Sequence, residues 1–186
     1  MSVELVTYAD IKNFLGLEQA SIDSYPALGV IRESVTSAIE EYLGRDLESK
    51  ERSETIRIHA PTSTAMIHLR AIPISSVSSV SVTILGDSES YTEDDDYEIT
   101  GYGLRLFSKV NHAKVAVTYT GGYADDDVPE AISRAALLQV VHEFQSKDQL
   151  GAESVSTEGG TVSRPPLGLL KEVTRMLNKY VHPLKW

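Results

Sequence analysis

Histidine and carboxylate side chains are the first candidates for chemistry in this sequence. His142 and Glu143 begin the His-Glu-x-x-His pattern of a zinc protease, but the position of the second histidine holds Ser146. The five histidines show no metal-ligand spacing, and without cysteine the chain has no thiolate ligand, no disulfide and no thiol nucleophile. We therefore predict no metal site and no cofactor.

Other catalytic patterns are also missing from the sequence. It has neither a Gly-x-Ser-x-Gly nucleophile elbow nor a phosphate-binding loop ending in Gly-Lys-Ser/Thr, and Gly101-Tyr102-Gly103 lacks the third glycine of a dinucleotide-binding turn. The aspartate runs lack the alternation and the glycine of an EF-hand calcium loop. A carboxylate pair for glycoside hydrolysis stays open, because the separation of two carboxylates depends on the fold. We expect a protein that is not an enzyme.

Composition limits the class of protein. The chain has 186 residues, 41% of them hydrophobic and 24% charged, which fits one globular domain or one domain with an appendage. No apolar run is long enough for a membrane span and no signal segment is recognisable, so we expect no membrane partner. The net charge of −10 argues against a surface that grips DNA phosphates, although it permits DNA to pass nearby.

Residues 114–150 predict a strand, a tight turn and a helix. Val115, Val117 and Tyr119 alternate with other residues as in a strand with one buried face. A pair of glycines then breaks the strand, and Pro129 suits the first turn of a helix over about 129–149. Apolar residues point in nearly every direction around this helix, so it is either the central core helix or a helix with one face covered by another subunit.

Two further helices precede a region of short strands. Helical spacing over about 7–15 and 26–43 ends at Gly16 and Gly44, and Thr7 is placed to cap the first helix. From about 51 to 120 the apolar period changes to two, as in Ile56 with Ile58, Met66 with His68, and Val80 with Val82 and Ile84. The fold class that follows is α+β, a small helical bundle with an inserted antiparallel β lobe.

The C-terminal region predicts a tether and a helix. Residues 151–166 have the composition of a flexible linker, which ends a core assigned to 1–150. Residues 167–186 recover the spacing of an amphipathic helix, whose apolar stripe needs a cover. The helix either folds back on its own domain or docks into a groove of another protein. Trp186 favours docking, because tryptophan is enriched among interface anchors.

Several stretches, in this order, resemble the head-tail connector proteins of long-tailed double-stranded DNA bacteriophages and gene transfer agents, which are also called adaptor or gateway proteins. The stretches are DIKNFL at 10–15, AIEEYLGR at 38–45, LRAIPISSV at 69–77, VTYTGGY at 117–123 and VPEAI at 128–132. The residues that carry the family's motifs are Tyr42, Arg45, Tyr119, Gly121, Gly122, Tyr123 and Pro129. The segment after residue 150 is variable in such proteins.

The resemblance implies a structural protein of the virion neck that is assembled in the host cytoplasm. Such proteins form a ring of roughly twelve copies beneath the portal protein. They extend the DNA tunnel without binding DNA specifically, and they carry the next neck or tail component. In this reading the C-terminal helix docks on the portal, and its candidate anchors are Leu170, Val173, Leu177, Tyr180 and Trp186.

Two other functions compete with the adaptor. One is a stopper or tail-completion protein of the neck, which differs from an adaptor in whether the portal binds it directly. The other is a small β module that binds carbohydrate, for which exposed aromatic residues would be the signature. The available tyrosines are Tyr91, Tyr97, Tyr102 and Tyr123.

Two acidic runs are candidates for the wall or rim of the tunnel, because acidic walls repel phosphates and let DNA slide. The first run is Glu93, Asp94, Asp95 and Asp96, and the second is Asp125, Asp126 and Asp127. The alternative for both runs is a solvated loop, with the second run also capping the helix that begins near residue 129.

Overall fold

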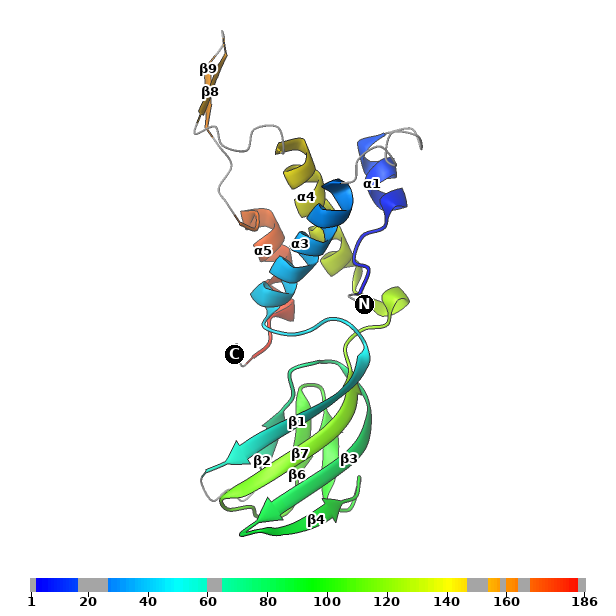
Figure 1. Cartoon of the computed structure of the whole chain (residues 1–186), viewed down its shortest axis with the longest axis vertical. Helices are drawn as coiled ribbons and strands as arrows, with labels where there is room; N and C mark the ends of the chain where they lie inside the picture. The colour runs from blue at the N-terminus through cyan, green and yellow to red at the C-terminus, as the bar shows by residue number, and fades with distance from the viewer. Residues whose placement is uncertain are drawn as a thin grey trace. The chain divides into compact units, whose positions relative to one another are not determined.

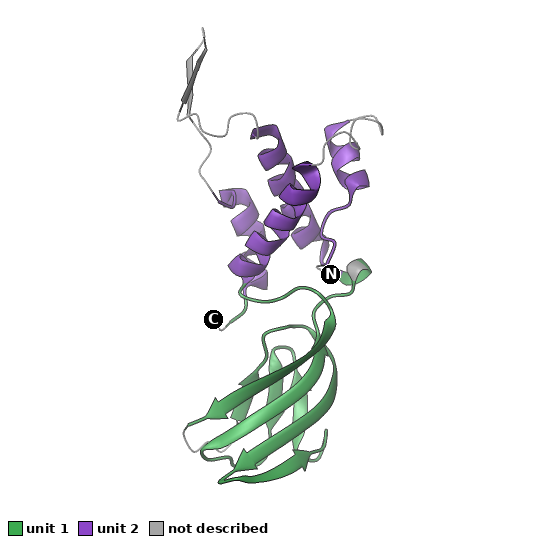
Figure 2. Cartoon of the chain, viewed as in Figure 1, with its two compact units in different colours: residues 1, 44–127, 182–186 green, residues 2–43, 128–181 purple. Residues whose placement is uncertain are grey.

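The chain forms two compact units in the computed structural model, which describes residues 3–16, 27–59, 65–146, 154–157, 160–163 and 168–183. We call residues 2–43 and 128–181 the helical unit, and residues 44–127 with 182–186 the β unit (Figure 2). Within the described residues the chain passes from one unit to the other after Leu43, after Asp127 and after Val181. Neither unit is therefore a continuous stretch of sequence.

The helical unit is built around one central helix. Its elements are α1 (Tyr8–Leu15), α3 (Ala27–Leu43), α4 (Glu130–Ser146) and α5 (Lys171–Leu177), which continues into the 3-10 turn η3 (Asn178–Tyr180) (Figure 1). Helix α4 packs against α1, α3 and α5, and buries Ile132, Ala136 and Val140. The all-round apolar pattern is thus explained by helices of the same chain. No helix in the described part of the chain is long and apolar enough to cross a membrane.

Local signals set the ends of helix α1. The Thr7 hydroxyl accepts a hydrogen bond from the backbone N–H of Asp10 at 3.1 Å, and the Asp10 carboxylate accepts one from the backbone N–H of Thr7 at 2.9 Å. These reciprocal bonds form the capping box predicted by Thr7 and hold the pKa of Asp10 below its usual value. At the other end Gly16 adopts φ 65°, a left-handed conformation that favours glycine.

The β unit consists of two antiparallel sheets. The four-stranded sheet has the order β1 (Lys50–Ile58), β7 (Ala113–Gly121), β3 (Ile74–Ile84) and β4 (Asp87–Tyr91). The three-stranded sheet has the order β2 (Ala65–His68), β6 (Gly103–Leu106) and β5 (Tyr97–Thr100). The fold class is therefore α+β with an inserted antiparallel lobe, as predicted.

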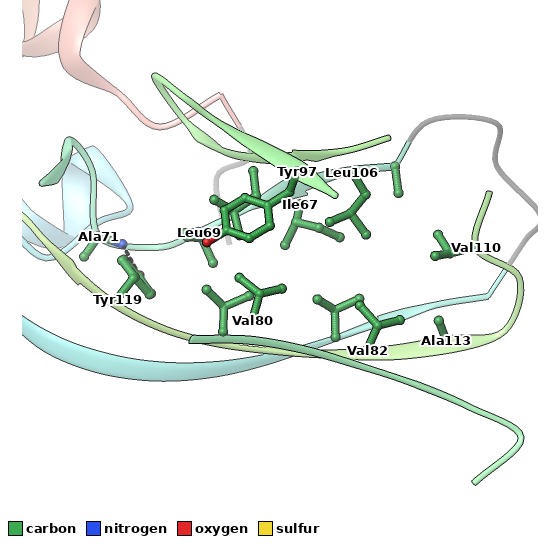
Figure 3. Packing of buried hydrophobic residues seen from close by; sticks show 14 residues of the cluster. Ile67, Leu69, Ala71, Val80, Val82, Tyr97, Leu106, Val110, Ala113 and Tyr119 are labelled. Atoms are coloured by element: carbon green, nitrogen blue, oxygen red, sulfur yellow. Dashed lines mark hydrogen bonds between the residues drawn. The ribbon is translucent and has the colours of Figure 1, made fainter. Parts of the chain in front are cut away.

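Alternation along the strands places one apolar layer between the sheets. Val80 and Val82 of the larger sheet point toward Ile67, Tyr97 and Leu106 of the smaller sheet (Figure 3). Along β7 the buried residues are Val115, Val117 and Tyr119, as their spacing predicted. In β2 the inward residues are Ala65 and Ile67, whereas Met66 and His68 occupy the other face.

The predicted linker, 151–166, includes an element of its own. Strands β8 (Ser154–Thr157) and β9 (Gly160–Ser163) pair as a two-stranded antiparallel hairpin. The helix predicted over 129–149 is Glu130–Ser146, and its last predicted residues lie outside the described ones.

Two glycines allow close approach of three backbone segments at the end of β7. A Cβ added to Gly121 would lie 2.3 Å from the carbonyl oxygen of Ala71. A Cβ on Gly122, whose φ is 109°, would lie 2.3 Å from the carbonyl oxygen of Glu48. Both obstructing atoms belong to the backbone, so neither can move aside at low cost.

The substitution Gly122→Ala should lower the free energy of unfolding by about 2–4 kcal/mol, because it combines a strained φ with a steric clash. Gly101→Ala is the matched control, since no atom lies within 4 Å of the added Cβ and the backbone does not require glycine. Urea unfolding followed by circular dichroism would measure both. Equal stabilities of the two variants would contradict the packing described here.

Candidate functional site

The loop Leu69–Pro73 of the β unit is where most of the motif residues named above come together. The guanidinium of Arg45 donates to the carbonyl oxygen of Ile72 at 2.8 Å and to the hydroxyl of Tyr123 at 3.3 Å. Its central carbon also lies 5.4 Å from the centre of the Tyr123 ring, within range of a cation–π interaction. Arg45 is buried, so these contacts offset part of the cost of removing its charge from water.

Tyr119 holds the next residue of the loop. Its hydroxyl accepts a hydrogen bond from the backbone N–H of Ala71 at 3.0 Å and donates one to the carboxylate of Glu54. The same carboxylate accepts from the backbone N–H of Arg70 at 3.2 Å. Burial raises the pKa of the Tyr119 hydroxyl well above its usual value, and the hydrogen bond to Glu54 is the second cause of this increase. The hydroxyl therefore stays protonated and keeps its role as a donor.

The remaining contacts with the loop come from Gly122, which directly follows β7, and from the C-terminal segment. The backbone N–H of Gly122 donates to the carbonyl oxygen of Pro73 at 2.9 Å, and the Ile72–Pro73 peptide bond is cis. The buried ring of His182 lies with Nε2 3.0 Å from the carbonyl oxygen of Leu69. We call Arg45, Tyr119, Gly122, Tyr123 and His182, with the loop they hold, the loop clasp.

The side chains of the loop clasp hold backbone groups. Its acceptors include the carbonyl oxygens of Leu69, Ile72 and Pro73, and its charged donor is already committed to one of them. Among the described residues, no three histidine or carboxylate side chains lie close enough together to hold a metal ion. The chemistry available here is structural.

The C-terminal segment folds back on the helical unit. The side-chain amide of Gln139, buried in α4, donates to the carbonyl oxygen of Gly168 at 3.2 Å and accepts from the backbone N–H of Leu170 at 3.0 Å. The hydroxyl of Tyr42 donates to the side chain of Asn178 at 2.5 Å. The motif residue Tyr42 therefore contacts the tail, in the region that the resemblance describes as variable.

The five predicted docking residues differ in how far they are buried. Val173 and Leu177 have no exposed surface, because they face the interior of the helical unit. Leu170 and Tyr180 are half-buried, and Trp186 lies outside the described residues. Of the two alternatives for the tail, the chain by itself adopts the folded-back one over α5, so Val173 and Leu177 are not free as anchors while α5 stays on α4.

The first acidic run forms an exposed turn between β4 and β5. Asp96 accepts a hydrogen bond from the backbone N–H of Thr92 at 2.8 Å, and Asp94 has a positive φ of 71°. Burial, with Glu93 and Asp94 nearby, raises the pKa of the Tyr97 hydroxyl. The second run forms the 3-10 turn η1 (Asp125–Asp127), and the next helix, α4, begins after Pro129.

The tyrosines do not form an aromatic binding platform. Tyr97 is buried in the core, Tyr123 belongs to the loop clasp, and the hydroxyl of Tyr91 lies 3.0 Å from that of Ser108. Only Tyr102, among these four, is exposed. This arrangement weakens the reading as a carbohydrate-binding module.

Exposed apolar side chains occur in both units. Val30 of α3 is 70% exposed, and Phe14 and Tyr8 of α1 are also exposed. The guanidinium carbon of Arg32 lies 4.4 Å from the centre of the Tyr8 ring, and Arg32 also pairs with Glu4. These residues make the α1–α3 surface a candidate contact with another protein.

Three residues of these sites were not anticipated from the sequence. Glu54 lies in a strand of alternating charge, and His182 is one of five scattered histidines, so neither stood out. Gln139 did carry a signal, because it is the one amide inside the apolar run 135–141 and such residues need a buried partner.

Comparison with known proteins places the chain among phage structural proteins. The model of a family described as head completion protein matches residues 4–181. A chain from the neck of an empty gene transfer agent (GTA) particle, computed with C6 symmetry, gives a TM-score of 0.57 at 14% identity over 92% of this chain and 87% of that one. A chain from the virion of a native GTA particle gives 0.50 at 15% identity over 83% and 76%. At these identities the similarity concerns the fold. No curated protein matches the chain.

Removing the Tyr119 hydroxyl should weaken the loop clasp. Tyr119→Phe leaves the N–H of Ala71 without its acceptor and removes one of the two donors to Glu54, so we expect a loss of about 1–3 kcal/mol in the free energy of unfolding. Tyr102→Phe removes the same atom from an exposed tyrosine and should change stability by less than about 0.5 kcal/mol. Chemical denaturation of both variants tests this, and a Tyr119→Phe protein as stable as the control would show that the hydroxyl is dispensable.

Gln139 should fix the start of the C-terminal segment. In Gln139→Leu the N–H of Leu170 loses its acceptor, and we expect a cost of about 1–3 kcal/mol with faster proteolytic cleavage before α5. Gln145→Leu, at an exposed position of the same helix, is the matched control. Limited proteolysis with mass detection would locate the cut. Unchanged cleavage in Gln139→Leu would mean that helix packing alone holds the segment.

Proposed function

The chain belongs to the head completion protein family, and on this premise we propose that it is a structural adaptor in the neck of a phage or gene transfer agent particle, with no catalytic turnover. The observation that carries the proposal is the family match over residues 4–181, which includes both units. The fold shared with a chain of a gene transfer agent neck supports it.

In this proposal the protein assembles as a ring of roughly twelve copies beneath the portal protein. The ring extends the DNA tunnel and offers a platform to the next neck or tail component. Exposed apolar residues on α1 and α3, above all Val30 and Phe14, are suitable for contacts between copies, because apolar groups left in water favour association. The virion neck is then the place where the protein acts.

The charge of the chain suits a tunnel through which DNA slides. Each copy carries a net charge of −10, so a ring would be strongly acidic and would repel phosphates. The exposed turn at Glu93, Asp94 and Asp95 is our candidate for the tunnel wall or rim. DNA would pass without specific binding, since a protein that grips DNA neutralises phosphates with basic side chains.

Docking on the portal is assigned to the C-terminal segment. Leu170 and Tyr180 are partly exposed while α5 stays on α4, and we propose them as anchors together with Trp186, which lies outside the described residues. Val173 and Leu177 could join them only if α5 were released, which would first expose two fully buried side chains at a cost of about 1.5–3 kcal/mol each.

The protein alone and mixed with the portal protein encoded near its gene should be compared by native mass spectrometry and negative-stain imaging. We expect rings that form chiefly with the portal. Trp186→Ala should weaken portal binding about 30-fold, the effect of losing an interface anchor worth about 2 kcal/mol. Tyr102→Ala removes an exposed aromatic side chain from the β unit and should leave binding unchanged.

A protein that stays monomeric and ignores the portal would overturn the adaptor assignment. The function would then be that of a stopper or tail-completion protein, which acts later in the neck. If Trp186→Ala and Tyr102→Ala both bind the portal as tightly as the unmodified protein, the adaptor assignment stands but the docking anchor lies elsewhere.

A further inference from the structure

Strand β3 has an open edge along its first half. β7 pairs with β3 from Ile74 to Ile84, but on its other side β4 covers only Val80 to Ile84. Residues 74–79 therefore present one side that no strand of the described chain covers. Four of these residues are serines, all exposed, so the backbone here is not shielded by large side chains.

The charged edges of the two sheets are protected against pairing. Edge strand β1 carries charges at five of its nine positions, and edge strand β4 carries Asp87 and Glu89 within five residues. Edge strand β5 carries Glu98. Charges on edge strands prevent them from adding a further strand. The remaining uncharged edges are β2, which has four residues, and the longer stretch 74–79 of β3.

The open stretch is shaped by two irregularities. The register with β7 shifts between Ile74 and Ser76 and again between Val77 and Ser79. At these bulges the hydroxyl of Ser75 donates to the carbonyl oxygen of Thr120 at 3.1 Å, and that of Ser78 donates to the carboxylate of Glu51 at 2.9 Å. Bulges increase the local twist, which discourages pairing with a long, flat strand.

The hairpin β8–β9 lacks a third strand among the described residues. Each of its strands has four residues and is uncharged, and each pairs only with the other among the described strands. A two-stranded hairpin is at best marginally stable in water, and a third strand stabilises it. Among the described strands, therefore, a short neutral hairpin has no third strand and one neutral edge of β3 has no partner strand.

We propose that the hairpin β8–β9 of one copy adds to the open edge of β3 (residues 74–79) of a neighbouring copy. This inference rests on the proposed ring and identifies one of its contacts. Backbone hydrogen bonds across an added strand provide such contacts without large side chains, which suits the serine-rich edge. Repeated head-to-tail around a closed ring, the contact satisfies every hairpin and every open edge at once.

A chain without cysteine allows a direct test by disulfide cross-linking. One batch of protein carries Ser79→Cys in β3, a second batch carries Thr161→Cys in β9, and the two are mixed and assembled with the portal protein before mild oxidation. We expect a cross-linked dimer that contains one chain of each kind. Since the two cysteines are on different chains, only pairing between copies gives this product.

Ser53→Cys mixed with Thr161→Cys is the matched control, because Ser53 is an exposed serine on the charged edge strand β1. This mixture should give less than about a tenth of the mixed dimer. Met66→Cys mixed with Thr161→Cys tests β2, the other uncharged edge. A preferred cross-link to position 66 would overturn the assignment to β3.

A second variant tests the contact without cysteine. Ser76→Lys places a charge on the open edge and should reduce the yield of rings on the portal about tenfold, whereas Ser53→Lys should not. Rings that form normally with Ser76→Lys and show no cross-link between positions 79 and 161 would overturn the strand addition but leave the adaptor function intact. A failure of the unmodified protein to form rings would overturn both.

One more sample tests whether the hairpin on the β3 edge belongs to the same chain or to a neighbouring copy. A protein carrying Ser79→Cys and Thr161→Cys in the same chain is oxidised without the portal. We expect no disulfide within the monomer. An intramolecular disulfide would show that a chain's own hairpin covers its edge, and would overturn pairing between copies.

Discussion

Burial of the loop Leu69–Pro73 is the constraint on which the β unit depends. This loop connects β2 of the smaller sheet to β3 of the larger sheet, and its backbone groups lie outside both ladders. Each such group is costly to bury without a partner. The partners come from distant parts of the sequence, namely Arg45 where the chain enters the unit, Tyr119 and Gly122 where β7 ends, and His182 in the C-terminal segment. The motif residues Arg45, Tyr119, Gly122 and Tyr123 thus meet one local requirement for hydrogen bonds. Arginine suits this place because its fork of donors reaches a carbonyl and a hydroxyl together.

The helical unit holds the C-terminal segment through two kinds of contact. Val173 and Leu177 give the segment an apolar anchor, while Gln139 and Tyr42 fix its direction through directional bonds. Any partner that binds the buried face of α5 competes with these contacts. Docking through the outer residues of the segment avoids that competition and preserves the fold of the subunit.

The fold class followed from the sequence because its signals are local. Period-two alternation in β7, the Thr7 cap and the Gly16 stop each depend on neighbouring residues, and each is found in the structure. The sequence did not indicate which face of β2 is buried, because Met66 is apolar like its buried neighbours Ala65 and Ile67. The fates of Tyr97, Tyr123 and Val173 depend on which segments meet in space, and spacing along the chain does not contain that information. Spacing along the chain likewise did not indicate that His182 contacts Leu69.

The contact between His182 and Leu69 also has a consequence for biosynthesis. The two residues are 113 positions apart, so at about 5–20 residues per second the ribosome adds His182 roughly 6–23 s after Leu69. During that interval the strands of the β unit are available to pair, but the carbonyl oxygen of Leu69 still lacks its imidazole partner. The β unit is therefore completed after translation has passed through the whole helical unit. A nascent chain therefore lacks this hydrogen bond of the β unit until residue 182 has been added.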